Sequence, residues 1–533
     1  MSFTESLQTI VEENENGLLA KHGSWERIKL GDVCDILNGF AFSSSGFNDS
    51  EGIPLLRIRD VTKSKTQTKY VGEFDPQYLV AHGDLLIGMD GDFNAALWRG
   101  SEALLNQRVC KLSPDDEFYS RSLLAYAIQG YLDAVNAKTS AITVKHLSSR
   151  TVSDIPLPLP PISEQNRIVN FLDGMLTRLD DAVASLERVQ RNLERYRASV
   201  LKAAVEGRLV PTEAEQARQE GRSYEPAGVL LERILAERKA RWIEDAAEKA
   251  RAKAESKALK AGKTWTPEDN AKALEKARKA AETKYKEPAS PDLSASGAQA
   301  GTTDLPEGWC WARIDSIGDV KLGRQRAPKH HTGEYMRPYL RVANVFEDRI
   351  DTTDVMEMNF TPDEFETYKL EVGDILLNEG QSLDLIGRPA MYNGEVPGAC
   401  FQNTLVRFRA SHLLERRYAL MVFLAYMHSG VFQGIARWTT NIAHLGASRF
   451  AALHFALPPV CEQGRIVAEV DAVLSRISAC KKNADLGIVR SANLRQSILK
   501  WAFEGKLVEQ DPNDEPASTL LERIRAERSE ARQ

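Results

Sequence analysis

The chain is poor in the residues and patterns that mark secreted, zinc-binding or membrane proteins. Its 533 residues include only six cysteines, none in a C-x-x-C pair, so neither a disulfide framework nor a zinc ribbon is expected. The N-terminus carries acidic residues in place of the basic start and apolar core of a signal peptide, and no apolar run approaches the ~20 residues of a membrane span. We therefore expect a protein of the reducing cytoplasm with no membrane partner.

The chain also lacks an excess of positive charge. Its formal net charge is -6. Residues 24–160 carry 14 lysine and arginine residues against 17 aspartate and glutamate residues, and residues 305–459 carry 16 against 18. Neither segment is a basic domain. If DNA is the ligand, a local face such as Lys63, Lys65 and Lys69 must dominate, or a partner protein must neutralise much of the phosphate charge.

Recognisable catalytic motifs are absent as well. Gly262-Lys263-Thr264 ends like a phosphate-binding loop, but Lys257 stands where that motif requires its first glycine. Neither segment contains an E-x-K sequence to complete a metal-dependent nuclease site, and no Asn-Pro-Pro-aromatic sequence is present to hold a flipped base. His330-His331 has no acidic or cysteine partner at ligand spacing, which favours a surface loop over a metal site. We expect no catalytic residue, cofactor or metal in this chain.

The chain does contain a long internal repeat. Pro160–Val169 returns as Pro458–Val467, an offset of 298 that holds without insertion as far as Val210 and its copy Val508. Upstream the offset drifts, because the loops differ in length. The upstream matches align Trp25-Glu26-Arg27-Ile28 with Trp311-Ala312-Arg313-Ile314, Gly31-Asp32-Val33 with Gly318-Asp319-Val320, and Gly83-Asp84-Leu85-Leu86 with Gly373-Asp374-Ile375-Leu376. This pattern indicates a duplicated domain with a shared framework and divergent loops.

Each copy begins with a compact segment of short strands and helices. Runs of β-branched and apolar residues bounded by glycine predict strands, and longer apolar periodicity predicts helices. The predicted strands are Pro54–Ile58, Asp84–Met89, Tyr339–Val342 and Asp374–Leu377, and the predicted helices are Arg121–Val135 and Glu415 to Trp438.

A long helix comes after each compact segment. The proline-rich step Ile155–Pro161 cannot be helical, and Ser163 is a plausible N-cap for the helix after it. Apolar residues then recur at alternating spacings of 4 and 3, a heptad seam. In the first copy it runs through Ile168, Leu172, Met175, Leu179, Ala182, Leu186, Val189, Leu193, Tyr196, Val200 and Ala203. In the second copy it runs through Ile466, Val470, Val473, Ile477, Cys480 and Ala484, weakens at Gly487 and Ser491, and resumes at Leu494, Ile498 and Trp501. About 44 residues at ~1.5 Å each give a rod of about 65 Å. Two unrelated amphipathic helices are the alternative, but matching seams favour pairing with each other.

The expected fold class is therefore α+β, with two similar globular domains separated by a pair of long antiparallel coiled-coil helices. Residues 231–287 are rich in Ala, Lys, Glu and Arg and favour a solvated helical hairpin broken near Gly262 to Pro267, although their lysine excess leaves a DNA contact open. The expected divisions are residues 1–23 as an extension, 24–161 as domain 1, 162–210 as a long helix, 211–287 as a helical hairpin, 288–304 as a linker, 305–459 as domain 2 and 460–533 as a long and a short helix.

The repeated Leu-Pro-Pro-hydrophobic-x-Glu-Gln-x-Arg-Ile-Val, with the helix end Glu-Gly-Arg/Lys-Leu-Val, resembles the DNA-specificity subunit of type I restriction-modification systems. The likeness runs from Trp25 to Arg528. It implies two target-recognition domains, each reading one half of a bipartite, asymmetric site on double-stranded DNA. It further implies two methyltransferase subunits and restriction subunits as partners, which hold S-adenosylmethionine, ATP and Mg²⁺ and perform all catalysis. The insertion at 240–287 departs from the family and leaves the partner contacts there open.

Base edges are read by long polar side chains on divergent loops. The candidate DNA-binding residues are Lys63, Lys65, Gln67, Lys69, Thr139 and Thr143 in the first domain, and Arg324, Gln325, Arg326, Lys329, Thr439 and Asn441 in the second. We expect the lysine group and the arginine group to lie at equivalent edges of the two domains.

Two other classes of function remain at this point. A non-enzymatic coiled-coil scaffold with duplicated binding heads explains the long helices but not the divergence of the loops. A nuclease or methyltransferase fused to recognition domains requires catalytic motifs that the sequence does not contain.

Overall fold

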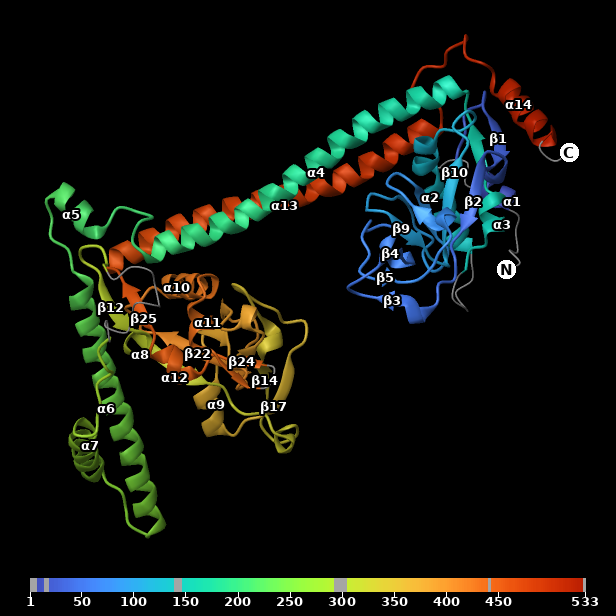
Figure 1. The fold of residues 1–533 in the computed structure, drawn as a ribbon. Coiled ribbons are helices and arrows are strands. Elements are labelled where there is room, and N and C mark those ends of the chain that lie inside the picture. Colours follow the sequence, from blue (N-terminus) through green and yellow to red (C-terminus); the bar gives the residue numbers. More distant parts are fainter. Residues whose placement is uncertain (1–6, 14–18, 139–145, 292–303, 440–441, 531–533) are drawn as a thin grey trace. The chain divides into compact units, whose positions relative to one another are not determined.

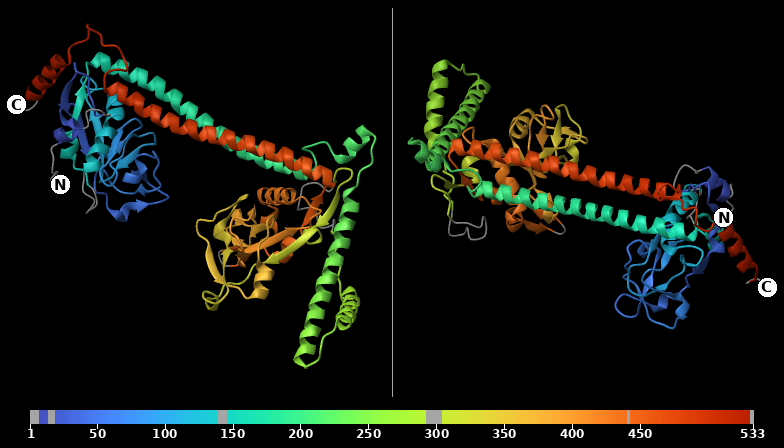
Figure 2. Two further views of the ribbon diagram at one scale, coloured as in Figure 1. Left: turned by 180° about the vertical axis from the view of Figure 1, so that it is seen from behind. Right: turned by 90° about the horizontal axis from the view of Figure 1, so that it is seen from above.

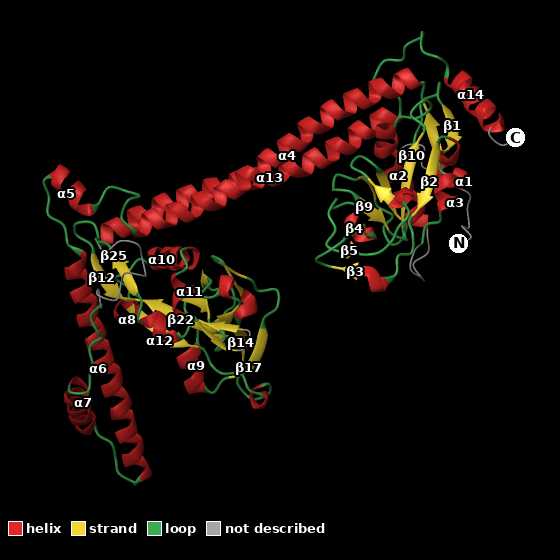
Figure 3. Ribbon diagram, viewed as in Figure 1, coloured by secondary structure: helices red, strands yellow, loops and turns green. Residues whose placement is uncertain are grey.

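The computed structural model describes residues 7–13, 19–138, 146–291, 304–439 and 442–530. It combines long helices with many short strands (Figures 1 and 3). The chain divides into two compact units: unit 1 comprises Met1–Arg188 with Asn483–Gln533, and unit 2 comprises Val189–Lys482. Each unit holds one globular domain and one part of each long helix. None of the helices described is long and apolar enough to cross a membrane.

The first domain, in unit 1, is built on two small sheets and a strand pair. The strand orders are β2-β10-β7-β8, β3-β5-β4-β9-β6 and β1-β11. The proline-rich strand β11 is tolerated because its two-stranded sheet consists only of edges. The helix α2 covers the first sheet with buried leucines and isoleucines such as Leu124 and Ile128. The elements are α1 (Leu7–Glu12), β1 (Glu26–Lys29), β2 (Cys34–Asn38), β3 (Phe47–Asn48), β4 (Ile53–Leu56), β5 (Lys69–Tyr70), β6 (Leu79–Val80), β7 (Leu85–Gly88), β8 (Ala95–Leu97), β9 (Ala103–Leu105), β10 (Val109–Pro114), α2 (Arg121–Lys138), α3 (Ser149–Ser153) and β11 (Pro156–Leu159).

The second domain, in unit 2, repeats the central sheet. Its order β13-β22-β18-β20 matches β2-β10-β7-β8, and the pair β12-β25 matches β1-β11. Its smaller sheets, β17-β14-β21, β15-β16 and β19-β24-β23, differ from those of the first domain. The elements are β12 (Cys310–Arg313), α8 (Ile314–Ile317), β13 (Gly318–Leu322), β14 (Met336–Leu340), β15 (Val345–Phe346), β16 (Arg349–Ile350), β17 (Met356–Asn359), α9 (Pro362–Tyr368), β18 (Ile375–Asn378), β19 (Gly380–Gln381), β20 (Pro389–Met391), β21 (Cys400–Phe401), β22 (Leu405–Ala410), α10 (Arg416–His428), α11 (Val431–Ile435), β23 (Arg437–Thr439), β24 (Ile442–His444), α12 (Ala447–Ala451) and β25 (His454–Leu457). The prediction of one framework with different loops is confirmed.

The strand register corrects the alignment of the two copies. Glu26 of β1 lies opposite Leu159, and Cys310 of β12 lies opposite Leu457. Because Leu159 and Leu457 are related by the repeat, Trp25 corresponds to Trp309. The sequence alignment of Trp25 with Trp311 is therefore wrong by two residues. The strand β2 begins at Cys34 and β13 begins at Gly318, each opposite the last residue of its partner strand, so Cys34 corresponds to Gly318. The alignment of Gly31-Asp32-Val33 with Gly318-Asp319-Val320 is therefore also wrong.

Two predicted helix boundaries also change. The segment from Glu415 to Trp438 is not one helix, because Gly430 adopts φ +83° and separates α10 from α11, and β23 begins at Arg437. This left-handed conformation suits glycine and ends a helix. Ser163, predicted as the N-cap of the long helix, instead lies inside its first turn, because the helix begins at Ile162.

The two long helices are α4 (Ile162–Val205) and α13 (Val460–Phe503). The boundary between the units falls within both. In each unit the helix segments lie side by side and antiparallel (Figures 1 and 2). In unit 2, Lys481 pairs with Glu194. In unit 1, Arg495 pairs with Asp180, and Gly487 leaves room for Leu186, whose Cδ1 is 2.9 Å from where a Cβ would stand.

The predicted seam has the right spacing but is partly wrong in its position around α4. Ile168, Leu172 and Val200 are buried as predicted, whereas Val189 is 44% exposed and Tyr196 53% exposed. The partly covered residues are instead Val183, Gln190 and Arg197, each one position further along the chain. On α13, Ile466, Val470, Val473, Ile477, Ala484 and Ile498 are buried as predicted, but Cys480, Leu494 and Trp501 are exposed. A helix of 3.6 residues per turn drifts relative to a 3.5-residue pattern, so the packed face moves away from some of the apolar positions.

Three more helices lie between α4 and the second domain, and one comes after α13. They are α5 (Glu213–Glu220), α6 (Ala227–Lys260), α7 (Pro267–Glu282) and α14 (Ala517–Glu530). The predicted hairpin with a break near Gly262 to Pro267 is confirmed by α6 and α7, where Thr266 caps α7 and accepts a hydrogen bond from the Asp269 backbone N–H.

Candidate nucleic-acid interface

Two adjacent buried side chains at the start of α4 attach the first domain to that helix. Glu164 is 1% exposed and accepts a hydrogen bond from the Trp25 indole Nε1 at 2.9 Å. Gln165 accepts from the Ser120 backbone N–H at 2.8 Å and donates to the Pro160 carbonyl at 2.9 Å. Buried polar groups are stable only when paired in this way. The Glu-Gln of the repeated motif is therefore a structural brace.

The second copy builds the same brace. The Trp309 indole donates to Glu462 at 2.8 Å, and Gln463 accepts from the Glu415 backbone N–H at 2.8 Å and donates to the Pro458 carbonyl at 2.9 Å. Burial raises the pKa of Glu462, while hydrogen bonds from the Glu213 backbone N–H and from Trp309 oppose this rise. The most similar part of the repeat is thus the part that fixes each domain to its long helix.

An arginine three residues after each glutamate extends the brace. Arg167 pairs with Asp514 at 2.6 Å in unit 1, and Arg465 pairs with Glu213 at 2.6 Å in unit 2. Burial alone raises the pKa of Glu213, but hydrogen bonds from Arg465 and Arg222 outweigh it, so that the pKa lies below its usual value. Each long helix is therefore also tied to the segment that leaves the end of the other helix.

In the first domain, the candidate residues lie on the loop that leads into β5. Lys63, Lys65 and Gln67 are exposed, whereas the Lys69 Nζ donates to the Ser50 carbonyl at 2.7 Å. Thr66 anchors this loop, because its hydroxyl donates to the Leu55 carbonyl at 2.8 Å. The structure thus presents three of the four polar side chains from one anchored loop and engages Lys69 within the domain.

In the second domain, Gln325, Arg326 and Lys329 are exposed on the loop after β13. Arg324 is different. It is only 7% exposed, pairs with Glu364 at 2.8 Å and stacks on the Phe360 ring at 4.9 Å. Its guanidinium holds α9 and β17 in place, so it is not presented to a ligand in the same way as its neighbours.

The two groups of candidates lie on different loops of the shared framework. Arg324 forms an isolated bridge with Gln402, as Phe40 does with Asn106. The arginine group therefore corresponds to the loop that begins at Phe40, whereas the lysine group comes after a 3-10 turn at Ile58–Asp60 that corresponds to Val342–Asn344. The expectation that the two groups occupy equivalent edges is therefore wrong. The sequence did not show this, because loop insertions hide which loops correspond.

The remaining candidates come shortly before a repeated histidine in the sequence. Thr139, Thr143 and Asn441 fall outside the described residues, and Thr439 is exposed on β23. His146, just after the first of these gaps, pairs with Asp90 at 2.6 Å, and His444 lies 3.9 Å from Glu379. Burial raises the pKa of Asp90, but hydrogen bonds from His146 and Arg108 outweigh it and lower that pKa overall.

Sequence reasoning missed an exposed cationic and aromatic pair on β23. Arg437 is exposed and Trp438 is 59% exposed, and Ile442 on the paired strand β24 is 48% exposed. Aromatic and apolar side chains are used by DNA-binding proteins to stack on bases and to wedge between them. The signal in the sequence was the alternation of polar and apolar residues in Arg-Trp-Thr, which the prediction of a helix through Trp438 obscured.

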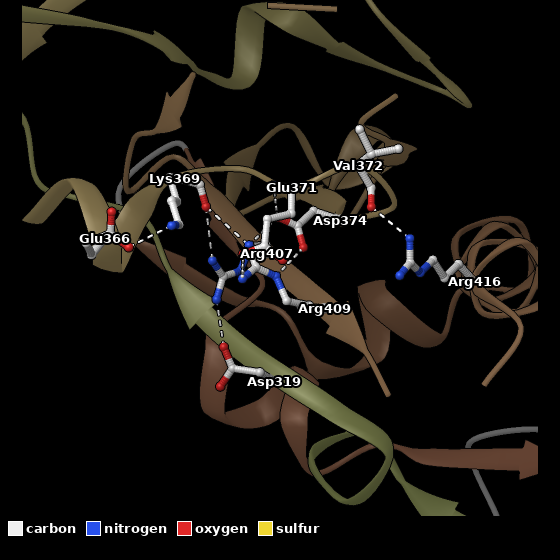
Figure 4. A network of polar contacts seen from close by, with 9 residues as sticks. All are labelled: Asp319, Glu366, Lys369, Glu371, Val372, Asp374, Arg407, Arg409 and Arg416. Carbon is white, nitrogen blue, oxygen red and sulfur yellow. Dashed lines mark hydrogen bonds and ion pairs between the residues drawn. The ribbon is translucent and has the colours of Figure 1, made fainter. Parts of the chain in front are cut away.

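A dense network of charges in the second domain is occupied within the fold (Figure 4). Arg409 binds Asp374 through two hydrogen bonds of 2.7 Å and Glu371 through one of 2.6 Å. Arg407 donates to Asp319 at 2.7 Å. These ion pairs neutralise one another and fix the loop between α9 and β18 to β22, so this cluster is not a phosphate-binding surface. Among the residues that the structure describes, no group of three or more His, Cys, Asp or Glu side chains is placed to hold a metal ion.

Comparisons with known proteins agree with this architecture. The family model for the type I restriction modification DNA specificity domain matches residues 23–194. The EcoBI specificity subunit of Escherichia coli is 31% identical over 544 residues, which cover 99% of this chain and 98% of the relative. The EcoKI specificity subunit of E. coli strain K12 is 20% identical over 531 residues, which cover 95% of this chain and 96% of that relative. A chain in a solved structure concerned with complex assembly of the type I R-M system shares the fold, with a TM-score of 0.58, 18% identity, and coverage of 91% of this chain and 99% of that one.

Two α+β domains on a pair of long helices, with a DNA specificity domain in the first copy, define a specificity protein of the restriction-modification class. The chain belongs to the family of type I restriction enzyme specificity subunits.

Proposed function

We propose that this chain is the DNA-recognition subunit of a type I restriction-modification complex, and that each domain reads one half of a bipartite, asymmetric site. The observation that carries the proposal is the pair of matching braces at Glu164–Gln165 and Glu462–Gln463, which hold two similar scaffolds whose loops differ. A shared scaffold with different loops is what two different half-sites require.

The readers of base edges are side chains exposed on those loops. They are Lys63, Lys65 and Gln67 in the first domain, and Gln325, Arg326, Lys329, Arg437, Trp438 and Thr439 in the second. Arginine and lysine bind guanine edges and glutamine binds adenine edges in the major groove of double-stranded DNA.

Catalysis belongs to partner subunits in this proposal. The long helices carry exposed apolar side chains, among them Val189, Tyr196, Val489 and Trp501, which are 44%, 53%, 58% and 53% exposed. Exposed apolar and aromatic residues are typical of protein interfaces. Two methyltransferase subunits dock on the helices, restriction subunits join them, and these partners carry S-adenosylmethionine, ATP and Mg²⁺ in the cytoplasm.

A domain exchange tests the proposal. Residues 24–155 are replaced by the equivalent segment of a relative, the chain is expressed with its methyltransferase partner, and the methylated motif is read by methylation-sensitive sequencing. One half of the motif should change and the other should remain. A change in both halves would contradict one domain for each half-site. The purified chain alone should transfer no methyl group, and robust transfer from S-adenosylmethionine by the chain alone would contradict the assignment of catalysis to partners.

A further inference from the structure

The helix α6 extends well beyond the part of it that matches α14. The beginning of α6 is equivalent to α14: Arg238 donates to the Gly318 carbonyl at 2.9 Å, and Arg528 donates to the Asp32 carbonyl at 3.0 Å. Residues 240 and 530 correspond, and from residue 240 the helix α6 continues to Lys260. We call residues 241–287 the charged hairpin.

The charge of this hairpin differs from that of the chain. It contains 13 lysine and arginine residues and 9 aspartate and glutamate residues, a formal charge of 13 - 9 = +4, whereas the whole chain has -6. The excess of positive charge is therefore specific to the charged hairpin, because the chain as a whole is acidic.

Four lysines form a stripe along α6. Lys249, Lys253, Lys257 and Lys260 are all exposed, and at 100° per residue they lie within a sector of about 80° of the helix surface. Within the described part of the chain, no carboxylate forms an ion pair with any of the four. The nearest acidic residue on this side is Asp245, one turn before the stripe. The four positive charges are therefore uncompensated along about 16 Å of helix.

The glutamates of the hairpin are used on another side of α6. Arg278 of α7 binds Glu244 at 2.7 Å, and Arg251 binds Glu248 at 2.6 Å, Glu255 at 2.8 Å and Asn270 at 2.8 Å. The contacts of Arg278 with Glu244 and of Arg251 with Asn270 join α6 to α7, whereas the pairs of Arg251 with Glu248 and Glu255 lie within α6. The packing of the hairpin thus separates its charges, with the carboxylates engaged near α7 and the lysine stripe facing away from it.

The stripe begins at a cleft shared with the second domain. Trp242, Asp245 and Lys249 of α6 line this cleft of about 570 Å³ together with Lys321 and Arg409 of the domain. The helix α6 runs alongside the second domain (Figure 1). Since Lys249 lies on the wall of this cleft, the stripe starts beside the second domain and continues from there along α6 to Lys260.

We propose that the lysine stripe of α6 binds the phosphate backbone of the DNA held by the second domain, independently of its sequence, beside the half-site that this domain reads. Successive lysines one turn apart stand about 6 Å from each other, a spacing that suits consecutive phosphates of one strand. The large apolar side chain between Lys249 and Lys260 is Leu259, which is 57% exposed but lies about 80° around the helix from Lys249, outside the sector of the four lysines. The lysine sector itself therefore offers no apolar core for a protein interface. The inference rests on DNA recognition by this chain and adds a positioning surface to it.

The test compares two variants that remove the same charge. The stripe variant carries K249Q, K253Q, K257Q and K260Q. The control carries K272Q, K276Q, K284Q and K286Q, which are exposed lysines of α7 and the segment after it. Glutamine preserves the helix propensity of lysine closely, so both hairpins should fold, and circular dichroism of the full chain checks this.

Binding is measured in the assembled complex with the methyltransferase partner, on duplexes with and without the methylated motif, from about 50 to 200 mM salt. The stripe variant should bind both duplexes more weakly by the same factor, and the slope of log affinity against log salt should decrease in magnitude by about 2 to 4. The methylated motif should not change. A duplex trimmed to the motif should abolish the difference between stripe variant and wild type.

Each other outcome overturns the inference. Equal slopes in the stripe variant and wild type show that the stripe does not touch DNA, and equal losses in both variants show a general charge effect. Loss of complex assembly in the stripe variant shows that the stripe docks a protein instead. If the wild-type complex shows no preference for a motif at all, it is the proposed DNA recognition that fails, and this result is distinct from the other three.

Discussion

At the residue scale, the brace depends on carboxylates that are buried among neutral donors. Glu462 is 0% exposed, and its oxygens accept hydrogen bonds from the Trp309 indole and the Glu213 backbone N–H. A buried carboxylate that loses a donor retains the cost of its desolvation without the compensating bond. The Trp309 indole therefore contributes more to the stability of the fold than the burial of its apolar surface alone.

Trp309→Phe should destabilise the chain by about 1 to 3 kcal/mol, because it leaves Glu462 with one donor fewer. Urea unfolding of the full chain measures this loss. Trp311→Phe is the matched control, since Trp311 is only partly buried and contacts His454 through its ring. If the Trp311 variant lost as much stability as the Trp309 variant, the corrected alignment of the two copies would be in error.

The pair of Glu213 and Arg465 should make stability depend on pH. The folded-state pKa of Glu213 is lowered from 4.5, so the pair contributes stability above pH 4.5 and loses it as pH falls through the lower folded-state pKa. Arg465→Met should be less stable than wild type at pH 7, and this gap should narrow as the pH falls below 4.5. Chemical unfolding at several pH values tests this. Arg476→Met, which changes an exposed arginine of α13, should show a small gap; a gap for Arg465→Met that stays constant would refute the linkage.

At the element scale, the sequence predicted those features that recur in both copies. The repeat of Pro160–Val169 indicated the two domains and the long helices, because a brace that needs a glutamate, a glutamine and an arginine at fixed spacing leaves a strong pattern. The pairing of Trp309 with Trp25 could not be predicted from the repeat. It depends on one hydrogen bond to Glu462, which lies far away in the sequence, and the residues around Trp311 matched those around Trp25 better. The burial of Arg324 depends on Glu364, forty residues later, and such distant partners leave no periodic signal.

The face of α4 that packs on α13 was also misjudged. The close contact between the two helices at Gly487 and Leu186 can be tested directly. Gly487 approaches Leu186 closely, whereas a Cβ on Gly174 meets nothing within 4 Å. Gly174→Ala should therefore stabilise the chain by about 0.5 to 1 kcal/mol through helix propensity. Gly487→Leu should destabilise it by about 1 to 3 kcal/mol through overpacking. Thermal unfolding of both variants compares them, and an equal gain for both would show that these helices do not pack at Gly487.

At the scale of the whole molecule, α4 and α13 each pass from one unit into the other. A bipartite site requires its two readers to be a defined number of base pairs apart, and these two helices are the elements that join the readers. In unit 1 and in unit 2 the helix segments pair in the same antiparallel sense. A change of length in both helices is therefore a change in the distance between half-sites, provided that the seam remains in register.

Adding one heptad to each helix, near Val183 in α4 and near Gly487 in α13, should preserve the packed faces and add ~10 Å of length. At ~3.4 Å per base pair this equals about three extra base pairs, with a rotation about the duplex that DNA twisting must absorb. Both half-site sequences should remain, and the preferred spacer should lengthen, or binding should be lost if the rotation is not absorbed. A four-residue insertion serves as the control, because it breaks the seam and should lower stability. The measurement is methylation of a library of spacer lengths by the complex with its methyltransferase partner. An unchanged spacer optimum in a folded heptad-insertion variant would show that these helices do not set the distance.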